Sequence, residues 1–510
     1  MKHQALLDTL DQKRAAAAAM GGERKLQKRK EAGDLNAQER IDVLVDGDSF
    51  IELGLLGTSV FDQDQDATPR DGKIVGFGKI NNRDVGVVVN DFTTKGASTS
   101  ATNSKKMGYI RKTCNERGIP FVHVGESTGA RLPDAMGSKG MGQLLGNDTS
   151  QFRRIREVPW VAAALNTSFG SSAWQCCCAD FSVMKKGSIM AVSSPRLVSM
   201  AIGEKIDLEE LGGWRLHAEQ TGLIDYFVES DQEAMMVIRR FLSYMPSHAN
   251  ELAPRGAVPE GSDADQEKIL DIIPESRTQV YNMKKILEIV VDNGSLLELK
   301  SRFGKSVVTS LARLDGHVVG IIANNPLTGG GALSAEACRK AIDFTVLCDS
   351  FNVPIIRFVD TPGFVVGAEA ERKGAPGQIM NFMNATCLTT VPQITVLCRK
   401  AYGRAYVAMG GGAHNDTMVA WPNAEVSFMD PVFATTIVHN KTAQDEGFED
   451  ALAEIRKDLE IWDMARIFSA HDVIKPQETR KFLIRMLEIH RRRKSGGISE
   501  RLMRSWPTSY

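Results

Sequence analysis

Two glycine-containing segments of this 510-residue sequence have the residue types needed to stabilise a negatively charged oxygen atom. They are residues 168–174 (SFGSSAW) and 401–412 (AYGRAYVAMGGG), and each follows an apolar run typical of a buried strand. Small residues after a strand let successive backbone N–H groups converge on one oxygen, often at the start of a helix. Each segment is therefore predicted to form an oxyanion hole. Two such holes suit a reaction in which two carbonyl oxygens gain charge.

Other common catalytic motifs are absent from the sequence. No GxGxxG follows a strand, no HExxH or GxSxG occurs, and the FGKS tail at 303–306 lacks the first glycine of a phosphate-binding loop. The histidines at 123, 217, 317 and 414 are scattered, and such residues are more often solvated or packed in a core than catalytic. For any single glycine, a tight turn or close helix packing is also the simpler explanation. It is the matched pair of segments that favours function.

The cysteines and the charge balance exclude several classes of protein. None of the eight cysteines forms a CxxC pair or has a histidine at ligand spacing, so we expect buried free thiols and neither a metal site nor disulfides.

The net charge of −1 provides no basic field for nucleic acid or an anionic membrane. The longest apolar stretch, 158–165, is far shorter than the roughly 20 residues of a membrane span. Residues 1–25 lack a secretion signal and predict an exposed helix and a cytoplasmic protein.

The two candidate segments belong to matching copies of an internal repeat. Aligning 83–92 (RDVGVVVNDF) with 317–326 (HVVGIIANNP) pairs Gly86 with Gly320, a shift of 234 residues. The same shift, without a gap, pairs Lys106 with Lys340, Cys114 with Cys348, Pro120 with Pro354, Glu126 with Asp360 and Gly129 with Gly363. A shift of 233 then pairs Gly170 with Gly403, Ser171 with Arg404 and Ser172 with Ala405. The sequence therefore predicts two homologous domains.

Each copy has the same predicted element order. A β-branched run (85–89 or 318–323) is followed by a loop, a helix, a short strand and a glycine-containing turn, which indicates α/β layers. In the second copy Ser334 is expected to cap the helix. The first copy is twelve residues longer around FDQDQDATPRD at 61–71, which we expect in a surface loop. A linker rich in Pro, Gly and acids at 247–268 separates domains predicted at 1–255 and 256–510.

Several strings in this order resemble one known family. VGESTGAR (124–131), VDTPGF (359–364), RKAYGRAY (399–406) and WPNAEVSFM (421–429) resemble the carboxyltransferase, or beta, subunits of biotin-dependent acyl-CoA carboxylases of the propionyl-CoA and methylcrotonyl-CoA type. Residues 21–52 and 472–480 resemble the same subunits, so the similarity covers nearly the whole chain. The resemblance implies two crotonase-like domains, each a ββα superhelix, and a ligase or transferase activity.

The resemblance also implies substrates and partners. Acyl-CoA would bind the N-terminal domain, with coenzyme A as part of the substrate, and carboxybiotin would bind the C-terminal domain. No biotin-attachment motif occurs here: the nearest string, VMKKG at 183–187, is incomplete, so Lys185 is expected at the surface. Biotin would therefore be carried by a separate biotinylated carrier or biotin carboxylase subunit. Because the N-terminal domain of one subunit would face the C-terminal domain of another, the implied assembly is a homo-oligomer, a hexamer by resemblance.

The family's site residues transfer to this sequence by motif. Gly170, Ser171 and Ser172 would polarise the thioester carbonyl, and Gly403, Arg404 and Ala405 the ureido carbonyl of biotin. Carboxybiotin would release CO2, and the biotin anion would then remove a proton from the α-carbon, or from the vinylogous γ-carbon, of the acyl-CoA. The resulting enolate would attack CO2, so that no side-chain base is needed. Substrate contacts fall on Gly129, Ala130, Arg131, Thr361, Pro362, Gly363, Phe364 and Val407. Arg131, Lys105 and Lys106 are candidate ligands for CoA phosphates, although a solvated helix face explains the lysines equally well.

The sequence departs from the family pattern at four places. A Gly-Gly-Ala run is replaced by Gly170-Ser171-Ser172, whose side chains are expected to narrow the pocket. Arg404 replaces a glycine of the propionyl type, although the methylcrotonyl type also has GRAY. Val407 replaces an acid, which favours a different, bulkier or unsaturated acyl group. Trp174 and the CCC run at 176–178 are better explained by core packing than by an altered pocket.

Three other functions stay open at this point. The same site run in reverse would make a biotin-linked acyl-CoA decarboxylase. A biotin-independent crotonase-type hydratase or hydrolase would need an acid or base beside Gly170, for which Glu126 is the nearest suggestion. A non-catalytic assembly subunit is the third.

Overall fold

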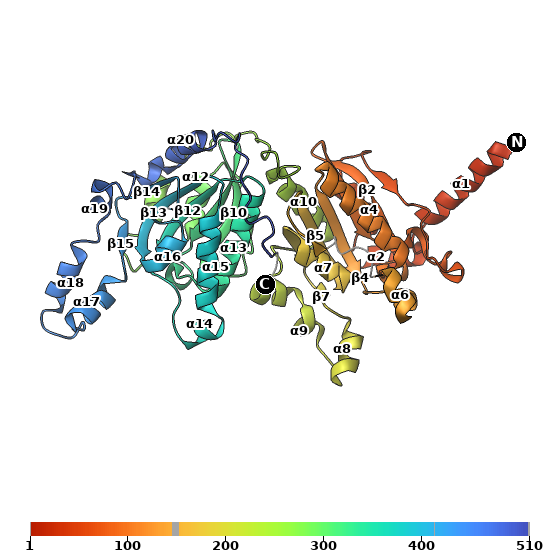
Figure 1. The fold of residues 1–510 in the computed structure, drawn as a ribbon, viewed down its shortest axis with the longest axis horizontal. Coiled ribbons are helices and arrows are strands. Elements are labelled where there is room, and N and C mark those ends of the chain that lie inside the picture. Colours follow the sequence, from red (N-terminus) through yellow and green to blue (C-terminus); the bar gives the residue numbers. More distant parts are fainter. Residues whose placement is uncertain (1, 145–151, 413, 508–510) are drawn as a thin grey trace. The chain divides into compact units, whose positions relative to one another are not determined.

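The computed structural model describes residues 2–144, 152–412 and 414–507, and they form two compact units. Unit 1 runs to Ala249 and also includes a short segment that begins at Ser505, and unit 2 is Asn250–Arg504. The border between the units thus lies at 249/250, whereas the sequence placed it at 255/256, inside the same linker. Both units are α/β structures, as predicted (Figure 1).

Unit 1 is built on one mixed sheet, in the order β1-β2-β3-β4-β5-β6-β8, with β7 beside β5. Strands β1 to β3 are antiparallel, and the strands that follow are parallel. The strands are β1 Ile51–Leu53, β2 Lys73–Ile80, β3 Arg83–Asn90, β4 Phe121–Ser127, β5 Trp160–Phe169, β6 Phe181–Lys185, β7 Ile189–Ala191 and β8 Tyr226–Val228. The helices are α1 Lys2–Ala18, α2 Glu23–Glu31, α3 Ala37–Leu44, α4 Ala101–Arg117, α5 Leu132–Ala135, α6 Gly137–Leu144, α7 Ser171–Cys178, α8 Pro195–Ile202, α9 Leu208–Gly212 and α10 Asp231–Tyr244.

Unit 2 repeats this strand order as β9-β10-β11-β12-β13-β14-β16, with β15 beside β13. Its strands are β9 Leu297–Leu299, β10 Val307–Leu314, β11 His317–Asn324, β12 Ile355–Thr361, β13 Gln393–Tyr402, β14 Thr417–Ala420, β15 Glu425–Ser427 and β16 Asp472–Val473. Its helices are α11 Lys268–Ile272, α12 Met283–Val290, α13 Ala335–Ser350, α14 Ala368–Arg372, α15 Ala375–Leu388, α16 Gly403–Ala408, α17 Pro431–His439, α18 Phe448–Arg456, α19 Ile461–Arg466 and α20 Thr479–His490.

The repeat extends to the hydrogen-bond register of the sheets. Gly86 lies opposite Phe121 between β3 and β4, and Gly320 lies opposite Ile355 between β11 and β12, at the shift of 234 seen in the sequence. Both units also have a register shift near the end of their next parallel pair, between Gly125 and Ser127 and between Val359 and Thr361. The predicted duplication is therefore confirmed down to single strand pairs.

The core of unit 2 shows how the sheet is covered. Apolar residues of α12 and α20, such as Leu287 and Leu483, pack on Val319 of β11 and Phe358 of β12. On the other face α13 and α15 lie side by side (Figure 1). Burying both faces explains the nearly continuous apolar strands of the sequence. Ser334 accepts a hydrogen bond from the N–H of Ala337, which confirms it as the N-cap of α13.

Two peripheral segments can be compared with their expectations. Helix α1 extends away from the sheet and is mostly exposed, as predicted (Figure 1). The insertion at 61–71 is exposed over most of its length, but Arg70 and Asp71 at its end are buried. Asp71 accepts a hydrogen bond from the N–H of Asn103 at the start of α4 and is hydrogen-bonded to Ser100. The last part of the insertion is therefore a structural anchor and not a surface loop.

Candidate active site

In unit 1 the candidate site begins where β5 turns into α7. Gly170 lies between them with φ +59° and ψ −121°, a backbone conformation that residues with a Cβ rarely adopt. The space around it is open, since the nearest atom to a Cβ built there would be the Cα of Gly129 at 3.8 Å. Glycine is therefore required by the backbone conformation and not by crowding.

Unit 2 has the same turn where β13 meets α16. Gly403 has φ +59°, and a Cβ on it would lie 2.8 Å from the carbonyl oxygen of Phe428. Both turns occur at the carboxyl end of the equivalent parallel strand. The structure thus gives each unit one glycine-led strand-to-helix turn at the positions that the sequence paired.

Backbone N–H groups at these turns lack a hydrogen-bond acceptor within the described structure, although Ser172 and Ala405 are buried. Among the described residues, no acceptor is found for the N–H groups of Ser171 and Ser172 at the start of α7, or of Arg404 and Ala405 in α16. The first N–H groups of a helix have no intrahelical partner. Neighbouring donors of this kind can stabilise an oxygen that becomes negatively charged.

The two serine side chains differ in direction. Ser171 Oγ lies 2.8 Å from Thr99 Oγ1. Ser172 is buried with its Oγ 3.5 Å from Ser168 Oγ, and a Cβ on Gly125 of β4 would overlap it. The expectation that both serines narrow the pocket is therefore wrong for Ser172, because its hydroxyl group is directed into the protein interior.

The loops after β4 and β12 are held in matching conformations. Gly129 (φ +102°) and Gly363 (φ +135°) each precede a residue in an isolated parallel bridge, Ala130 with Thr99 and Phe364 with Leu333. The hydroxyl of Thr361 donates to the carbonyl of Gly363. Thr361 is buried and Pro362 is half-buried. Of the predicted contacts in unit 1, the structure brings Gly129 next to Gly170.

The predicted phosphate ligands of unit 1 have structural partners. Arg131 is buried, its Nη1 lies 2.7 Å from Asp71 Oδ1, and its guanidinium also donates to Ser98. Lys106 Nζ donates to the carbonyl oxygens of Arg70 and Lys73, and burial lowers its pKa to about 8. Both cations are occupied by these internal partners, and Arg131 is buried and Lys106 half-buried, whereas Lys105 is exposed.

In unit 2 Arg404 and Val407 lie one turn apart on α16. Arg404 is exposed, and its side chain has no hydrogen bond or ion pair with any described residue. Val407 is half-buried and Ala405 is fully buried. Since residues three apart share a helix face, Arg404 and Val407 border the same side of the Gly403 turn.

Glu126 is not free to act as an acid or base. It is buried, and its carboxylate accepts from Arg29 at 2.9 Å, from Arg40 at 2.8 Å and from Asn166 Nδ2 at 3.1 Å. Its repeat partner Asp360 is likewise buried and accepts from Arg399 Nε at 3.0 Å. The paired acids therefore anchor the ends of β4 and β12.

Comparisons with known proteins agree with this geometry. The model of the carboxyl transferase domain family matches residues 28–503. The chain is 32% identical over 492 residues to the propionyl-CoA carboxylase beta chain of Roseobacter denitrificans, covering 94% of this chain and 95% of that protein. It is 31% identical to the methylmalonyl-CoA carboxyltransferase 12S subunit of Propionibacterium freudenreichii, with 95% and 94% covered. A crystal structure of transcarboxylase 12S superposes with a TM-score of 0.87 at 30% identity, covering 96% of each chain.

The chain belongs to the carboxyl transferase family. It is accordingly an enzyme, and the predicted fold of two crotonase-like α/β domains is confirmed by its match to a carboxyltransferase structure. The resemblance recognised from the motifs is confirmed as well.

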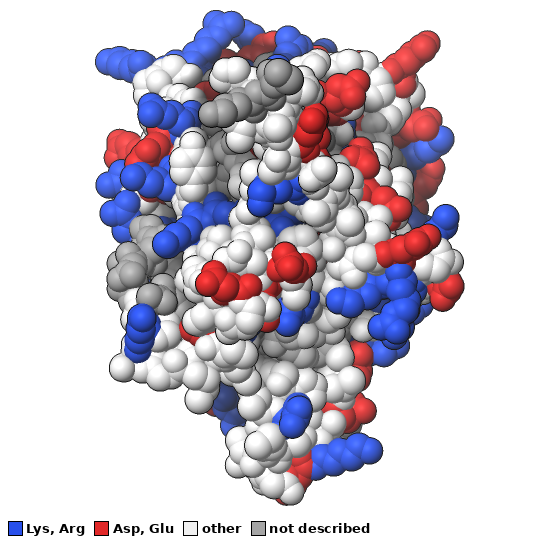
Figure 2. All heavy atoms as spheres, turned by 90° about the vertical axis from the view of Figure 1, so that its right-hand side faces the viewer, with Lys and Arg blue, Asp and Glu red and all other residues white. Residues whose placement is uncertain are grey.

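One pocket of this carboxyltransferase was not predicted from the sequence. It has a volume of about 530 Å³ in unit 1 and lies between α2 and the ends of β3 to β5. Its cations are Lys25, Lys28, Arg29 and Lys95. The basic string ERKLQKRKE of α2 was the sequence signal that could have indicated an anion-binding pocket. However, α2 precedes β3 by more than fifty residues, and only folding brings the two elements together. Two acids, Asp34 and Glu126, also line this pocket, and on the face shown in Figure 2 Lys and Arg side chains are likewise interspersed with Asp and Glu.

Two expectations about packing in the carboxyltransferase are corrected. Lys185, expected at the surface, is buried, and its Nζ lies 2.6 Å from Asp34 and 2.8 Å from Asp231. Trp174, expected in the core, is 39% exposed and contacts Phe152 edge-on. Cys176 is buried as expected, and burial raises the pKa of its thiol.

All eight cysteines are free thiols, and Cys387 is exposed, contrary to the expectation that all are buried. Within the described ranges, no group of three or more metal-ligating side chains occurs. The same residues include no helix with the length and apolarity needed to cross a membrane.

Proposed function

We propose that this chain is the carboxyltransferase subunit of a biotin-dependent acyl-CoA carboxylase. It would transfer CO2 from carboxybiotin, carried by a separate biotinylated subunit, to the α-carbon or vinylogous γ-carbon of an acyl-CoA. The observation that carries the proposal is the matched pair of turns: Gly170 and Gly403 share the same φ, and each is followed by N–H groups without an acceptor among the described residues.

Each turn suits one carbonyl oxygen. The N–H groups of Ser171 and Ser172 would donate to the thioester oxygen and stabilise the enolate that forms when the substrate loses its proton. Those of Arg404 and Ala405 would donate to the ureido oxygen of biotin, which two adjacent donors could bind together. Carboxybiotin supplies both the CO2 and, after its loss, the base. No side-chain base is then needed, which agrees with the occupied carboxylate of Glu126.

The pocket beside α2 supports binding of coenzyme A. Lys28 is exposed and has no hydrogen bond or ion pair with any described residue, while Lys25 Nζ donates to the carbonyl of Thr93 at 2.7 Å. A volume of about 530 Å³ with several cations suits a phosphate-bearing ligand. We therefore assign the CoA phosphates to this pocket and not to Arg131 or Lys106. Val407 in place of an acid favours a bulkier or unsaturated acyl group.

We propose a homo-hexamer as the assembly. Helices α8 and α17, at equivalent positions of the two units, expose apolar side chains, among them Met200 and Ile202 on α8 and Phe433 and Ile437 on α17. Exposed apolar patches of this kind mark association surfaces. The solved transcarboxylase 12S is described as a hexamer with methylmalonyl-coenzyme A bound.

A second candidate is the reverse reaction, decarboxylation of a dicarboxylic acyl-CoA onto biotin. It is favoured by the methylmalonyl-CoA decarboxylase subunit alpha of Veillonella parvula, which is 31% identical over 498 residues. The same two holes serve both directions, because forward and reverse reactions share one transition state. A biotin-independent hydratase or hydrolase lacks support, since Glu126 is held by two arginines.

The test is a reconstitution. The purified chain is incubated with a biotinylated partner, bicarbonate, ATP and acyl-CoA thioesters that range from short saturated to branched unsaturated chains. Formation of a carboxylated thioester supports the proposal. Turnover without biotin, or no turnover with any thioester although the chain is folded, would contradict it. Rates are also measured with the dicarboxylic thioester and free biotin carrier, and a faster reaction in this direction than in carboxylation would favour the decarboxylase.

A further inference from the structure

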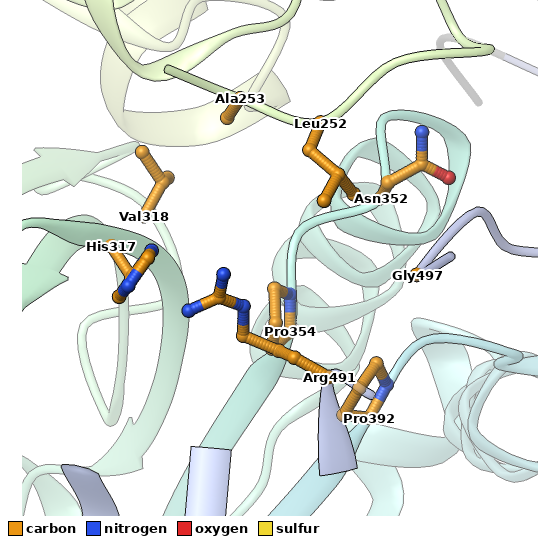
Figure 3. A pocket seen from close by; sticks show the side chains of 9 residues that line it. All are labelled: Leu252, Ala253, His317, Val318, Asn352, Pro354, Pro392, Arg491 and Gly497. Atoms are coloured by element: carbon orange, nitrogen blue, oxygen red, sulfur yellow. The ribbon is translucent and has the colours of Figure 1, made fainter. Parts of the chain in front are cut away.

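Unit 2 contains a second pocket whose position separates it from the candidate active site. It is lined by Leu252, Ala253, His317, Val318, Asn352, Pro354, Pro392, Arg491 and Gly497 (Figure 3). His317 begins β11, Pro354 precedes β12 and Pro392 precedes β13, and these three strands are parallel to one another. The pocket therefore lies at the amino ends of the strands, whereas the Gly403 turn lies at their carboxyl ends.

The walls of this pocket are held by specific hydrogen bonds. Asn352 Nδ2 donates to the carbonyl of Glu251 at 2.8 Å, and its Oδ1 accepts from the N–H of Ser499 at 2.9 Å. One side chain thus fastens both the linker at 251–253 and the C-terminal segment near Gly497 to the end of α13. The pocket is a built feature of unit 2 and not an open surface groove.

Two of its three polar side chains, those of His317 and Arg491, are basic or cationic. Figure 3 shows the guanidinium group of Arg491 and the imidazole of His317 directed toward each other. Neither side chain has a hydrogen bond or ion pair with any residue in the described part of the chain. Burial and then the charge of Arg491 lower the pKa of His317 to about 4. Burial and then the charge of Arg255 lower the pKa of Arg491.

Nearby acids compensate this charge only in part: Asp315 and Glu488 act to raise the pKa of Arg491, but each of them also pairs with another arginine. Asp315 lies 2.6 Å from Arg255, and Glu488 lies 2.7 Å from Arg485. Arg313 donates to the carbonyl oxygens of Pro254 and Gly316 and adds a further positive charge close to His317. No acidic side chain lines the pocket itself, and a half-buried guanidinium group without a hydrogen-bonded partner is unfavourable.

We propose that this pocket binds a small inorganic oxyanion of the size of sulfate or phosphate, held by the guanidinium group of Arg491 and an N–H of His317. Guanidinium groups bind oxyanions through paired N–H donors. The cavity has a volume of about 30 Å³ and is partly open, so it cannot enclose a nucleotide or coenzyme A, and a small ion would bind partly exposed at its mouth. The bound ion would tie the residue that follows α20 to the amino end of β11. This inference does not depend on the proposed function.

Sulfate is the probe, because its charge is constant between pH 5 and 8. Isothermal titration of the full chain with sodium sulfate, at an ionic strength fixed with sodium chloride, measures binding directly. The variant is Arg491→Gln, and the matched control is Arg492→Gln, the next residue, which is exposed and does not line the pocket. We expect the affinity to fall at least tenfold in the variant and to stay within twofold in the control.

A second variant keeps the test decisive if Arg491→Gln does not fold. His317→Val, at the first residue of β11, is expected to weaken sulfate binding several-fold while circular dichroism stays unchanged. Equal affinity of the wild-type chain and both variants would overturn the proposal, as would a wild-type chain that binds no sulfate. Loss of binding in Lys28→Gln but not in Arg491→Gln would place the ion in the unit 1 pocket and would also overturn it.

Discussion

The sulfur atom of Cys114 occupies the space that a side chain on Gly86 would need. A Cβ built on Gly86 would overlap Cys114 Sγ, and a Cβ built on Gly320 would likewise overlap Cys348 Sγ. Helix α4 therefore approaches β3 as closely as α13 approaches β11, and both contacts join residues that the repeat pairs. In each copy, therefore, a strand glycine packs directly against a buried cysteine of the following helix.

Gly86→Ala is expected to destabilise the protein by about 1–3 kcal/mol, because the added methyl group overpacks the helix against the strand. The free energy of unfolding in urea measures the effect. In a Cys114→Ala background the same substitution should be less destabilising, since the clashing sulfur is gone. Additive effects of the two substitutions would mean that the contact is not responsible.

Gly170→Val is expected to lower kcat/KM for carboxyl transfer at least about 100-fold, the size of effect seen when an oxyanion donor is lost. Valine cannot adopt φ +59° without strain, so the N–H groups of Ser171 and Ser172 would move. The control is Gly187→Val, where φ is +75° and the surroundings are open. If both variants lost activity equally, general strain would explain the result.

Arg404→Glu is expected to abolish carboxyl transfer without loss of folding. Its side chain is exposed and makes no contact that stabilises unit 2, but a negative charge beside the Gly403 turn would oppose charge growing on the biotin oxygen. Initial rates and thermal unfolding are measured together, with the exposed Arg492→Glu as the control. Unchanged activity would remove Arg404 from the site.

Lys28→Glu is expected to raise KM for acyl-CoA about tenfold or more with little change in kcat, because the substitution places a negative charge near the CoA phosphates. Lys30→Glu is the matched control on α2, since Lys30 is exposed but does not line the pocket. Equal KM values for the two variants would show that the CoA phosphates do not bind in this pocket.

Lys340→Met is expected to flatten the pH dependence of stability above neutrality. Burial lowers the pKa of Lys340 to about 7 from its ordinary 10.5, so the unfolded chain binds a proton that the folded chain has lost between these values. The free energy of unfolding therefore rises with pH across this window, by up to about 1.4 kcal/mol per pH unit. Urea unfolding from pH 7 to 9.5 measures the slope, with the exposed Lys285→Met as the control. The same slope in wild-type and Lys340→Met proteins would contradict the prediction.

Side-chain partners were the least predictable part of the site. Arg131 was predicted to bind phosphate, but Asp71, sixty residues earlier, pairs with it. Lys185 was expected to be solvated, but Asp34 pairs with it across 151 residues of sequence. Ser172 was expected to line the pocket, but the close approach of Gly125 accommodates its hydroxyl. Each of these outcomes depends on a distant segment that no local pattern identifies.

The sequence alone determined the duplication, the α/β element order, the family and the two glycine turns. These features depend on backbone preferences and apolar periodicity within a few residues. Because the sequence is duplicated, each of these local patterns occurs in both copies. The tertiary structure decided the environment of each charge: it buried Arg131, paired the half-buried Lys106 with two backbone carbonyls, brought Lys28 to a pocket, and left Arg491 facing His317. The reason is that the environment of a charge is set by segments that meet only when the sheets assemble.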